Sequence, residues 1–419
     1  MTASNLAGRP ISVDDYIDLV IDSVPVLPPF EQTLLDAQGC AVGTDLASPV
    51  DLPSFDNSAM DGYAVHAVDI AGATAERPVR LPVSGDIAAG ADNAIVVPSG
   101  MAARIMTGAP LPQGADTVVP VEFTDGRTVT VGVHRPVPPG MHVRRQGEDT
   151  KAGDMLVSRG TRLTARHIAT LAAAGIYRVN AHPRPRVVVL STGSELVAPG
   201  NPLTSAKIYD ANSFALSALV RSAGAVAYRV GIVPDEPNEL MAVLEDQLVR
   251  ADLVLTSGGV SVGAYDVVKQ VLSRLGTVAF YSVAMQPGKP QGFGTVGEDH
   301  TPIFTLPGNP VSAFVSFEVI IRPVLRKMLG IASPRGEYRK AVTTQGWDSP
   351  PGRRQYARGW YDLRADGVGT VRPIGNQGSH MVGDLTGSNC LIVVPEETSH
   401  VPPGARVDVL PLDDGSAGN

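Results

Sequence analysis

Three glycine-rich loops, each directly after a short apolar run, hold the residues best suited to chemistry in this chain. They are STGSEL at 191–196, SGGVSVG at 257–263 and LPGNPVS at 306–312. Backbone amides left uncovered by glycine, together with the N-termini of following helices, bind negatively charged oxygens. The loops therefore predict a ligand that carries phosphate or a similar oxyanion.

The apolar runs before these loops predict strands. Residues 187–190, 253–256 and 303–306 are short, rich in β-branched side chains and bounded by Gly or Pro, which is typical of strands buried on both faces of a parallel sheet. Loops at the carboxyl ends of such strands form ligand crevices. The loop residues expected to bind substrate there are Thr192, Gly193, Ser257, Gly258, Gly259, Ser261, Gly263, Pro307, Gly308 and Asn309.

Carboxylates follow several predicted strands. Glu195, Asp235 and Asp266 lie at or just beyond a strand end. A single carboxylate in such a place is more often a helix cap or a surface charge. Three at one edge of a sheet would suit Mg²⁺, which prefers carboxylates beside phosphate oxygens. The eight histidines show no H-E-x-x-H or paired spacing, so none is predicted to bind a transition metal.

Two glycine motifs have other interpretations. GFGTVG at 292–297 matches a dinucleotide-binding pattern, but no helix follows it, which favours a strand with a turn. GVSVG at 259–263 matches a nucleophile elbow and would make Ser261 the nucleophile of a serine hydrolase. An elbow needs its helix to begin at the serine, whereas Asp266 is the expected N-cap here. The same glycines could form an anion site, so the hydrolase stays an alternative.

Composition excludes several classes of protein. The net charge is −8 with both signs interspersed, so no footprint for nucleic acid is visible. No apolar run approaches the roughly 20 residues that cross a bilayer, so no membrane association is expected. Only Cys40 and Cys390 are present, without C-x-x-C spacing, which argues against a disulfide framework or a thiolate zinc site. We therefore expect a cytoplasmic protein.

Hydrophobic spacing predicts a discontinuous helical domain made of residues 1–50 and 144–182. Ser12 is the expected N-cap of a first amphipathic helix, a second short helix is expected over 31–39, and Thr164 should cap a helix that stops at Gly175. Between these parts, residues 51–143 consist of short valine-rich runs broken by Gly and Pro, which indicates an inserted, mostly-β module.

The remaining chain predicts two further domains. Residues 183–330 alternate strands with helices, which indicates an α/β layered domain, with Pro237 and Pro310 in first helical turns and Gly330 at a helix end. Residues 331–419 carry short alternating runs that predict a small C-terminal β domain resembling a barrel. The expected fold class is multi-domain α/β plus β.

Two turns in the β module are dense in functional groups. They are DNSAMDGYA at 56–64 and RIMTGAP at 104–110. Turn chemistry alone could explain either one. From the residues by themselves, structure and function are equally good explanations.

Together these motifs resemble the molybdopterin molybdenumtransferases, the molybdenum-insertion enzymes whose eukaryotic relatives include the E domain of gephyrin. The resemblance covers nearly the whole chain. The three crevice loops are similar to loops in the related molybdopterin adenylyltransferases. Segments 56–65, 104–110 with 114–116, and 143–149 resemble motifs of the insertion enzymes that the compact adenylyltransferases lack.

The resemblance implies a function and an assembly. It implies four domains and a homodimer whose active site lies between the α/β domain of one subunit and the β module of the other. The implied substrates are adenylylated molybdopterin and molybdate. Metal insertion is coupled to Mg²⁺-dependent cleavage of the adenylate, which gives the cofactor and AMP. An adenylyltransferase is a candidate partner, and a catalytically silent scaffold like gephyrin is a further alternative that the intact acidic residues oppose.

The resemblance also implies roles for single residues. Those implied for catalysis are Asp61 and Thr107, offered by the partner subunit, with Glu195, Asp235 and Asp266 in the crevice; the four carboxylates are the candidate Mg²⁺ ligands. Those implied for molybdate are Lys289, Ser312, Arg353 and Ser379, since cationic donors and hydroxyls suit a tetrahedral dianion. Many relatives read Lys-Pro-Gly-Lys where this chain has Gln286, so a positive charge is missing beside the anion site.

Overall fold

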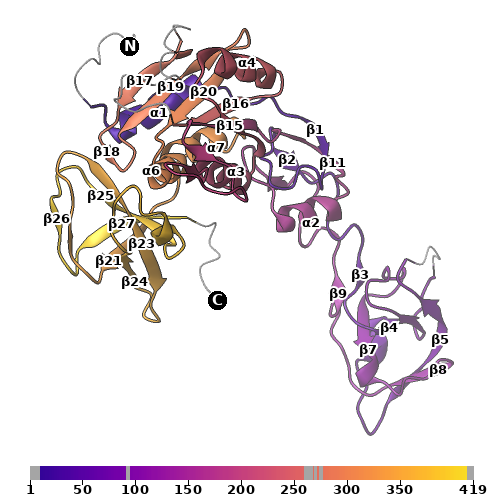
Figure 1. Ribbon diagram of the computed structural model, residues 1–419. Coiled ribbons are helices and arrows are strands. Elements are labelled where there is room, and N and C mark those ends of the chain that lie inside the picture. The colour runs from indigo at the N-terminus through magenta and orange to yellow at the C-terminus, as the bar shows by residue number, and fades with distance from the viewer. Residues whose placement is uncertain (1–9, 91–94, 259–267, 269–270, 273–276, 413–419) are drawn as a thin grey trace.

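The structure is a computed structural model that describes residues 10–90, 95–258, 268, 271–272 and 277–412 (Figure 1). Four predicted site residues lie outside the described residues, namely Gly259, Ser261, Gly263 and Asp266. The architecture confirms the expected fold class, multi-domain α/β plus β.

A six-stranded sheet forms the centre of the α/β part, in the order β15-β12-β16-β20-β19-β17. The three predicted parallel strands are confirmed as β12 (Arg186–Thr192), β16 (Leu253–Ser257) and β20 (Thr301–Leu306), and β15 (Val226–Val233) joins them in parallel. At the other edge, β19 (Pro290–Val296) and β17 (Ala279–Ser282) run antiparallel to their neighbours. The GFGTVG motif lies in β19 and the turn after it, as predicted.

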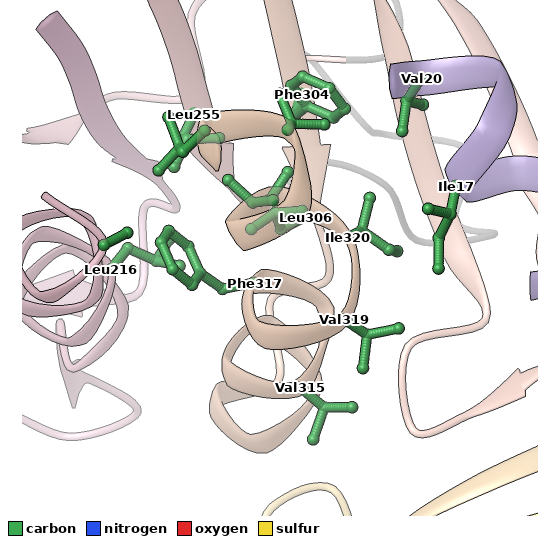
Figure 2. Packing of buried hydrophobic residues seen from close by; sticks show 14 of the residues in the cluster. Ile17, Val20, Leu216, Leu255, Phe304, Leu306, Val315, Phe317, Val319 and Ile320 are labelled. Atoms are coloured by element: carbon green, nitrogen blue, oxygen red, sulfur yellow. The ribbon is translucent and has the colours of Figure 1, made fainter. Parts of the chain in front are cut away.

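Helices cover both faces of this sheet. On one face lie α1 (Val13–Ser23), α3 (Asn212–Ser222), α6 (Pro310–Ser316), the π-helical turn η4 (Phe317–Ile321) and α7 (Arg322–Met328). Figure 2 shows Phe304 and Leu306 of β20 near Ile320, with Ile17 and Val20 of α1 alongside. The other face is covered by α4 (Pro237–Leu248). Successive residues of the central strands point alternately into the hydrophobic core on one face of the sheet and the core on the other. This is expected for a sheet that is buried on both sides.

The discontinuous region contains strands as well as helices. Ser12 caps α1 by accepting from the Asp15 amide at 3.1 Å, as predicted. The helix expected over residues 31–39 is wrong, because β1 (Phe30–Thr33) pairs with β11 (Arg178–Ala181) and turns follow it. The predicted helix after Thr164 is α2 (Ala165–Ala173), and Gly175 follows its end at φ +78°. A second pair of strands in this region joins β2 (Leu46–Ala47) to β10 (Met155–Val157).

A curled five-stranded sheet, ordered β7-β4-β6-β5-β8, forms the β module. Its strands and short 3-10 turns are β4 (Gly62–Val65), η2 (Ala67–Ile70), β5 (Val79–Ile87), β6 (Ala102–Ile105), β7 (Thr117–Pro120), η3 (Val121–Phe123) and β8 (Thr130–Val133). The paired strands β3 (Asn57–Ser58) and β9 (Val143–Arg144) connect it to the rest, and the module stands away from the α/β sheet (Figure 1).

The C-terminal region is a closed barrel of five strands, which bears out the predicted barrel-like domain. They are β21 (Arg339–Thr343), β23 (Arg354–Leu363), β24 (Gly369–Pro373), β25 (Cys390–Val394) and β27 (Arg406–Pro411), with closure between β23 and β25. Smaller elements are β22 (Trp347–Asp348), η5 (Val382–Leu385) and β26 (His400–Val401). From the α/β part, β18 (Met285–Gln286) pairs in parallel with β23. None of the helices in the described residues has the length and apolar character needed to span a membrane.

Candidate functional site

The three predicted crevice loops meet at the carboxyl ends of β12, β16 and β20. A Cβ added to Gly258 would lie 2.6 Å from the Thr192 carbonyl oxygen, and one added to Gly308 would lie 3.6 Å from the Gly258 Cα. The Gly258 amide donates to the Leu306 carbonyl at 3.2 Å. Only glycine allows so close an approach of loop to loop at φ +95°, the conformation of Gly258. The predicted residues of the three loops that are described thus lie together at this edge of the sheet.

Asn212, the first residue of α3, ties two of these loops together. Its Nδ2 donates to the Ser257 Oγ at 2.6 Å and to the Gly308 carbonyl at 2.7 Å. The sequence reasoning missed this residue. The available signal was a polar Asp-Ala-Asn-Ser stretch at the start of a helix that packs on the sheet.

Asp210 is a buried carboxylate beneath the crevice. Its Oδ1 accepts from the Ser191 Oγ at 3.0 Å and from the Ser213 amide at 3.0 Å, and its Oδ2 accepts from the Ser213 hydroxyl. These bonds join the end of β12 to the first turn of α3. Asp210 therefore fixes the position of Asn212, and the sequence reasoning missed it as well.

Glu195 belongs to the first loop, and Asp235 contacts that loop. The Asp235 Oδ2 accepts from the Ser194 amide at 2.8 Å. A Cβ on Gly193 would lie 2.7 Å from both carboxylate oxygens of Glu195, so this side chain folds back over its own loop. The Lys207 ammonium donates to the Ser194 carbonyl, which places a cation on the same loop.

These two carboxylates fit the requirements of Mg²⁺. The ion prefers hard oxygen ligands and is commonly held by one or two carboxylates together with water and substrate phosphate oxygens. Among the described residues no group of three or more His, Cys, Asp or Glu converges on one point. Two carboxylates at a loop that is predicted to bind phosphate therefore suit a magnesium ion that arrives with its substrate, rather than a cage made only of protein.

The predicted molybdate residues come from segments that touch one another. The Asn309 Nδ2 donates to the Ser379 Oγ at 2.9 Å, and the Val311 amide donates to the Ser379 carbonyl at 3.3 Å. Ser312 follows in the first turn of α6 and is buried. The C-terminal barrel thus places Ser379 against the third crevice loop.

Arg353 approaches the same region from the start of β23. Its Nη1 donates to the Gln286 Oε1 at 3.1 Å. The segment that follows Gln286 leads to the exposed Lys289 and is held against α6, because the Gln291 Nε2 donates both to the Gly288 carbonyl and to the Ser316 Oγ at 2.7 Å. The residue that departs from the family pattern therefore contacts a predicted molybdate ligand directly.

Arg358 is a fully buried cation behind the Ser379 loop. Its Nη2 donates to the Asn376 carbonyl and lies 3.7 Å from the Asp384 Oδ2. Burial is the main reason that its pKa falls below the usual arginine value. Sequence reasoning missed Arg358, and the one signal available was its place in an otherwise buried strand.

In the β module, the polar turns contain one carboxylate with a structural role and one that is exposed. Asp56 is structural, because it accepts from the Arg145 Nη1 at 2.6 Å and the Gln146 amide at 2.7 Å at the connection to the rest of the chain. Asp61 is exposed, and its Oδ1 accepts from both the amide and the hydroxyl of Thr107, at 2.7 and 2.8 Å. The Thr107 amide is the main cause that lowers the pKa of Asp61.

Within a single chain, Asp61 and Thr107 stand apart from the crevice. They lie in the module that Figure 1 places away from the α/β sheet. The structure thus brings together the crevice loops, Glu195 with Asp235, and the segments of the molybdate set. It does not bring Asp61 to them.

Comparison with known families covers most of the chain. Residues 11–175 match the MoeA N-terminal region (domain I and II), residues 188–327 a probable molybdopterin binding domain, and residues 340–412 the MoeA C-terminal region (domain IV).

Comparison with individual proteins agrees with these family matches. The chain is 45% identical over 407 residues to molybdopterin molybdenumtransferase 2 of Mycobacterium tuberculosis, covering 96% of this chain and 99% of that protein. It is 36% identical to the molybdopterin molybdenumtransferase of Haemophilus influenzae, with the same coverage. Among solved structures, a molybdopterin biosynthesis MoeA protein from Pyrococcus horikoshii matches with a TM-score of 0.79 and 32% identity, covering 96% of this chain and 99% of that one.

Proposed function

The chain belongs to the molybdopterin molybdenumtransferase family, and from that premise we propose that it inserts molybdate into adenylylated molybdopterin and releases AMP with the molybdenum cofactor. It is an enzyme of molybdenum cofactor biosynthesis. The hydrolase and the silent scaffold find no support among its relatives.

The observation that carries the proposal is the contact between the third crevice loop and the C-terminal barrel. The Asn309–Ser379 hydrogen bond of 2.9 Å joins the crevice loops, which we expect to bind phosphate, to the hydroxyl and guanidinium donors expected to bind molybdate. A pterin phosphate in the crevice and an oxyanion at Ser312, Arg353 and Ser379 would then be neighbours. Insertion of a metal requires that arrangement, because both reactants must be held together.

Each group of residues has a distinct part in the proposed reaction. The loop amides and the N-terminus of α6 bind phosphate oxygens. Glu195 and Asp235 would hold Mg²⁺, whose charge neutralises the phosphates during cleavage of the adenylate. Lys289 and Arg353 offset the two negative charges of molybdate, and Ser312 and Ser379 donate hydrogen bonds that orient it.

We also propose that a second copy completes the site. Asp61 and Thr107 are exposed, ordered by two mutual hydrogen bonds, and borne on a module that extends away from its own sheet (Figure 1). A homodimer in which this module reaches the partner's crevice would bring Asp61 beside the adenylate. A molybdopterin adenylyltransferase is the proposed supplier of the substrate, and the cytoplasm is the proposed location.

Single-turnover release of AMP tests the reaction. Purified protein is given adenylylated molybdopterin and Mg²⁺, with and without molybdate, and both AMP and metal-containing cofactor are measured. We expect AMP release that depends on molybdate, and loss of that dependence in Arg353→Gln. Absence of AMP release under tight substrate binding would refute the proposed reaction.

A further inference from the structure

Two polar atoms beside the crevice loops are shielded from solvent and have no hydrogen-bond partner among the described residues. They are the Oδ1 of Asn212 and the Oγ1 of Thr192. Neither has a part in the reaction described above. Buried polar groups in folded proteins are almost always paired, so each unpaired one requires an explanation.

The orientation of the Asn212 amide follows from its neighbours. The Gly308 oxygen is a carbonyl and can only accept, so the atom 2.7 Å from it must be the donating Nδ2. The same nitrogen donates to the Ser257 Oγ at 2.6 Å. Both amide hydrogens are therefore used, and the free atom is an acceptor held in one direction.

Both unpaired atoms belong to side chains that adjoin residues 257–258. Asn212 reaches Ser257 from α3, while a Cβ on Gly258 would lie 3.1 Å from the Thr192 Oγ1. An acceptor and a hydroxyl that both adjoin one loop can each pair with a polar atom of a bound heteroaromatic ring. Buried Asp210 fixes the first turn of α3, so the acceptor is preorganised.

We propose that Asn212 is a specificity-determining residue whose Oδ1 accepts a hydrogen bond from an exocyclic amino group of the substrate. The proposal rests on the proposed function, since adenylylated molybdopterin carries one such group on its pterin and another on its adenine. A site with a buried acceptor rejects an analogue that presents oxygen in place of the amine, because two acceptors then face each other.

Binding of paired ring analogues tests the proposal and identifies the ring. Wild-type protein is titrated with pterin and with lumazine, which differ by amine against oxygen, and likewise with AMP and with IMP. We expect the amino member of one pair to bind at least about tenfold more tightly. Preference within the pterin pair assigns the contact to the pterin, and preference within the nucleotide pair assigns it to the adenine.

Variants then assign the preference to Asn212. Asn212→Leu should bind both members of the pair equally. Ser257→Ala removes one acceptor of the Asn212 Nδ2 but leaves its hydrogen bond to the Gly308 carbonyl, so the Oδ1 keeps its direction. This variant should retain the preference even where both affinities fall. A purely structural role would weaken both analogues alike.

Two outcomes overturn the proposal: no preference within either pair for the wild type, or a preference that survives in Asn212→Leu. These measurements need neither molybdate nor turnover. Failure of the insertion reaction would therefore appear as missing AMP release with the preference intact, and failure of the present proposal as the reverse.

Discussion

At the scale of the residue, the pairing of Asp61 with Thr107 is the best-defined feature of the β module. One carboxylate oxygen of Asp61 accepts hydrogen bonds from both the amide and the hydroxyl of Thr107. These two bonds fix the orientation of the carboxylate although the side chain is exposed. The two donors lower the pKa of Asp61, with the backbone amide as the larger cause. The carboxylate is thereby held charged and aimed without being buried.

Thr107→Val should therefore impair turnover and change its pH dependence. Valine keeps the backbone donor and removes the hydroxyl, so the pKa of Asp61 should rise toward its ordinary value. If Asp61 must be ionised, the acid limb of AMP release, followed between about pH 3 and pH 6, should move to higher pH. At neutral pH we expect a loss of about tenfold, the value of one hydrogen bond to a charged group.

Thr128→Val, in the same module and also exposed, serves as the control and should behave as wild type. An unchanged acid limb in Thr107→Val would show that Asp61 does not govern it.

Gln286 allows a second prediction at this scale. It accepts a hydrogen bond from Arg353 at 3.1 Å and supplies no charge to molybdate. Gln286→Lys should lower the KM for molybdate by about fivefold, the difference between a neutral and a charge-assisted hydrogen bond. Gln286→Met, which removes the polar contact and adds no charge, should raise it. A higher KM in the lysine variant would mean that its repulsion of Arg353 outweighs its attraction for the dianion.

At the scale of the element, the crevice depends on how closely its loops approach. Gly258 has φ +95° and no room for a Cβ, whereas Gly200 has φ +96° and open space around its Cα. Gly258→Ala and Gly200→Ala should each lose about 1 kcal/mol of stability from the left-handed backbone. Only Gly258→Ala should also lose substrate binding, measured by titration with AMP, because its methyl group displaces the Thr192 carbonyl. Equal affinities in the two variants would contradict this account of the crevice.

The junction between α1 and the barrel gives a prediction about pH. Arg354 donates to both carboxylate oxygens of Asp14, at 3.1 and 2.8 Å, and its hydrogen bond is the main cause that lowers the pKa of Asp14. A folded-state pKa below the unfolded value stabilises the fold above the unfolded pKa, and this stability disappears as pH falls through the folded pKa.

Asp14→Asn should thus lower stability at neutral pH by about 1 kcal/mol, since the carboxylate is half exposed. The difference from wild type should shrink below about pH 4. Urea denaturation at several pH values measures it, with the exposed Asp22→Asn on the same helix as control. A difference that does not change with pH would mean that packing, and not charge, is what the asparagine disturbs.

The elements also show where sequence reasoning succeeds. The parallel strands, the cap at Ser12 and the first-turn position of Pro237 were predictable because their signals are local: β-branched runs, a capping side chain, a proline in the first turn. The helix expected over residues 31–39 was wrong because β1 pairs with β11, almost 150 residues later in the chain. Leu34 and Ala37 have helical spacing, but they point into a core from turns.

The same distinction applies to the candidate site. Glycine loops and strand-end carboxylates can be recognised from the sequence alone. Asn212, Asp210 and Arg358 do not, because each acts through partners that only the fold supplies. The contact of Gln286 with Arg353 is of the same kind, since a parallel pairing of β18 with β23 brings together residues 67 positions apart.

At the scale of the whole molecule, the position of the β module decides where catalysis occurs. Asp61 belongs to a module that stands away from its own crevice (Figure 1), whereas Arg353 contacts Gln286 of its own α/β part. If sites are shared, a dimer formed from one Asp61→Asn chain and one Arg353→Gln chain has one intact site and one doubly altered site. If each chain contains its whole site, the same dimer has none.

Mixed dimers purified through two different tags should therefore recover about half of the wild-type AMP release, although each parent homodimer is nearly inactive. Size-exclusion chromatography establishes that the preparation is dimeric, and dimers carrying both substitutions on one chain provide the matched control. That control also has one wild-type chain. If sites are shared between subunits, however, one of its sites lacks Asp61 and the other lacks Arg353, so the control should stay nearly inactive. If the control were half active and the mixed dimer silent, Asp61 would have to reach the crevice of its own chain. The extended module would then need to fold back over its own sheet during turnover.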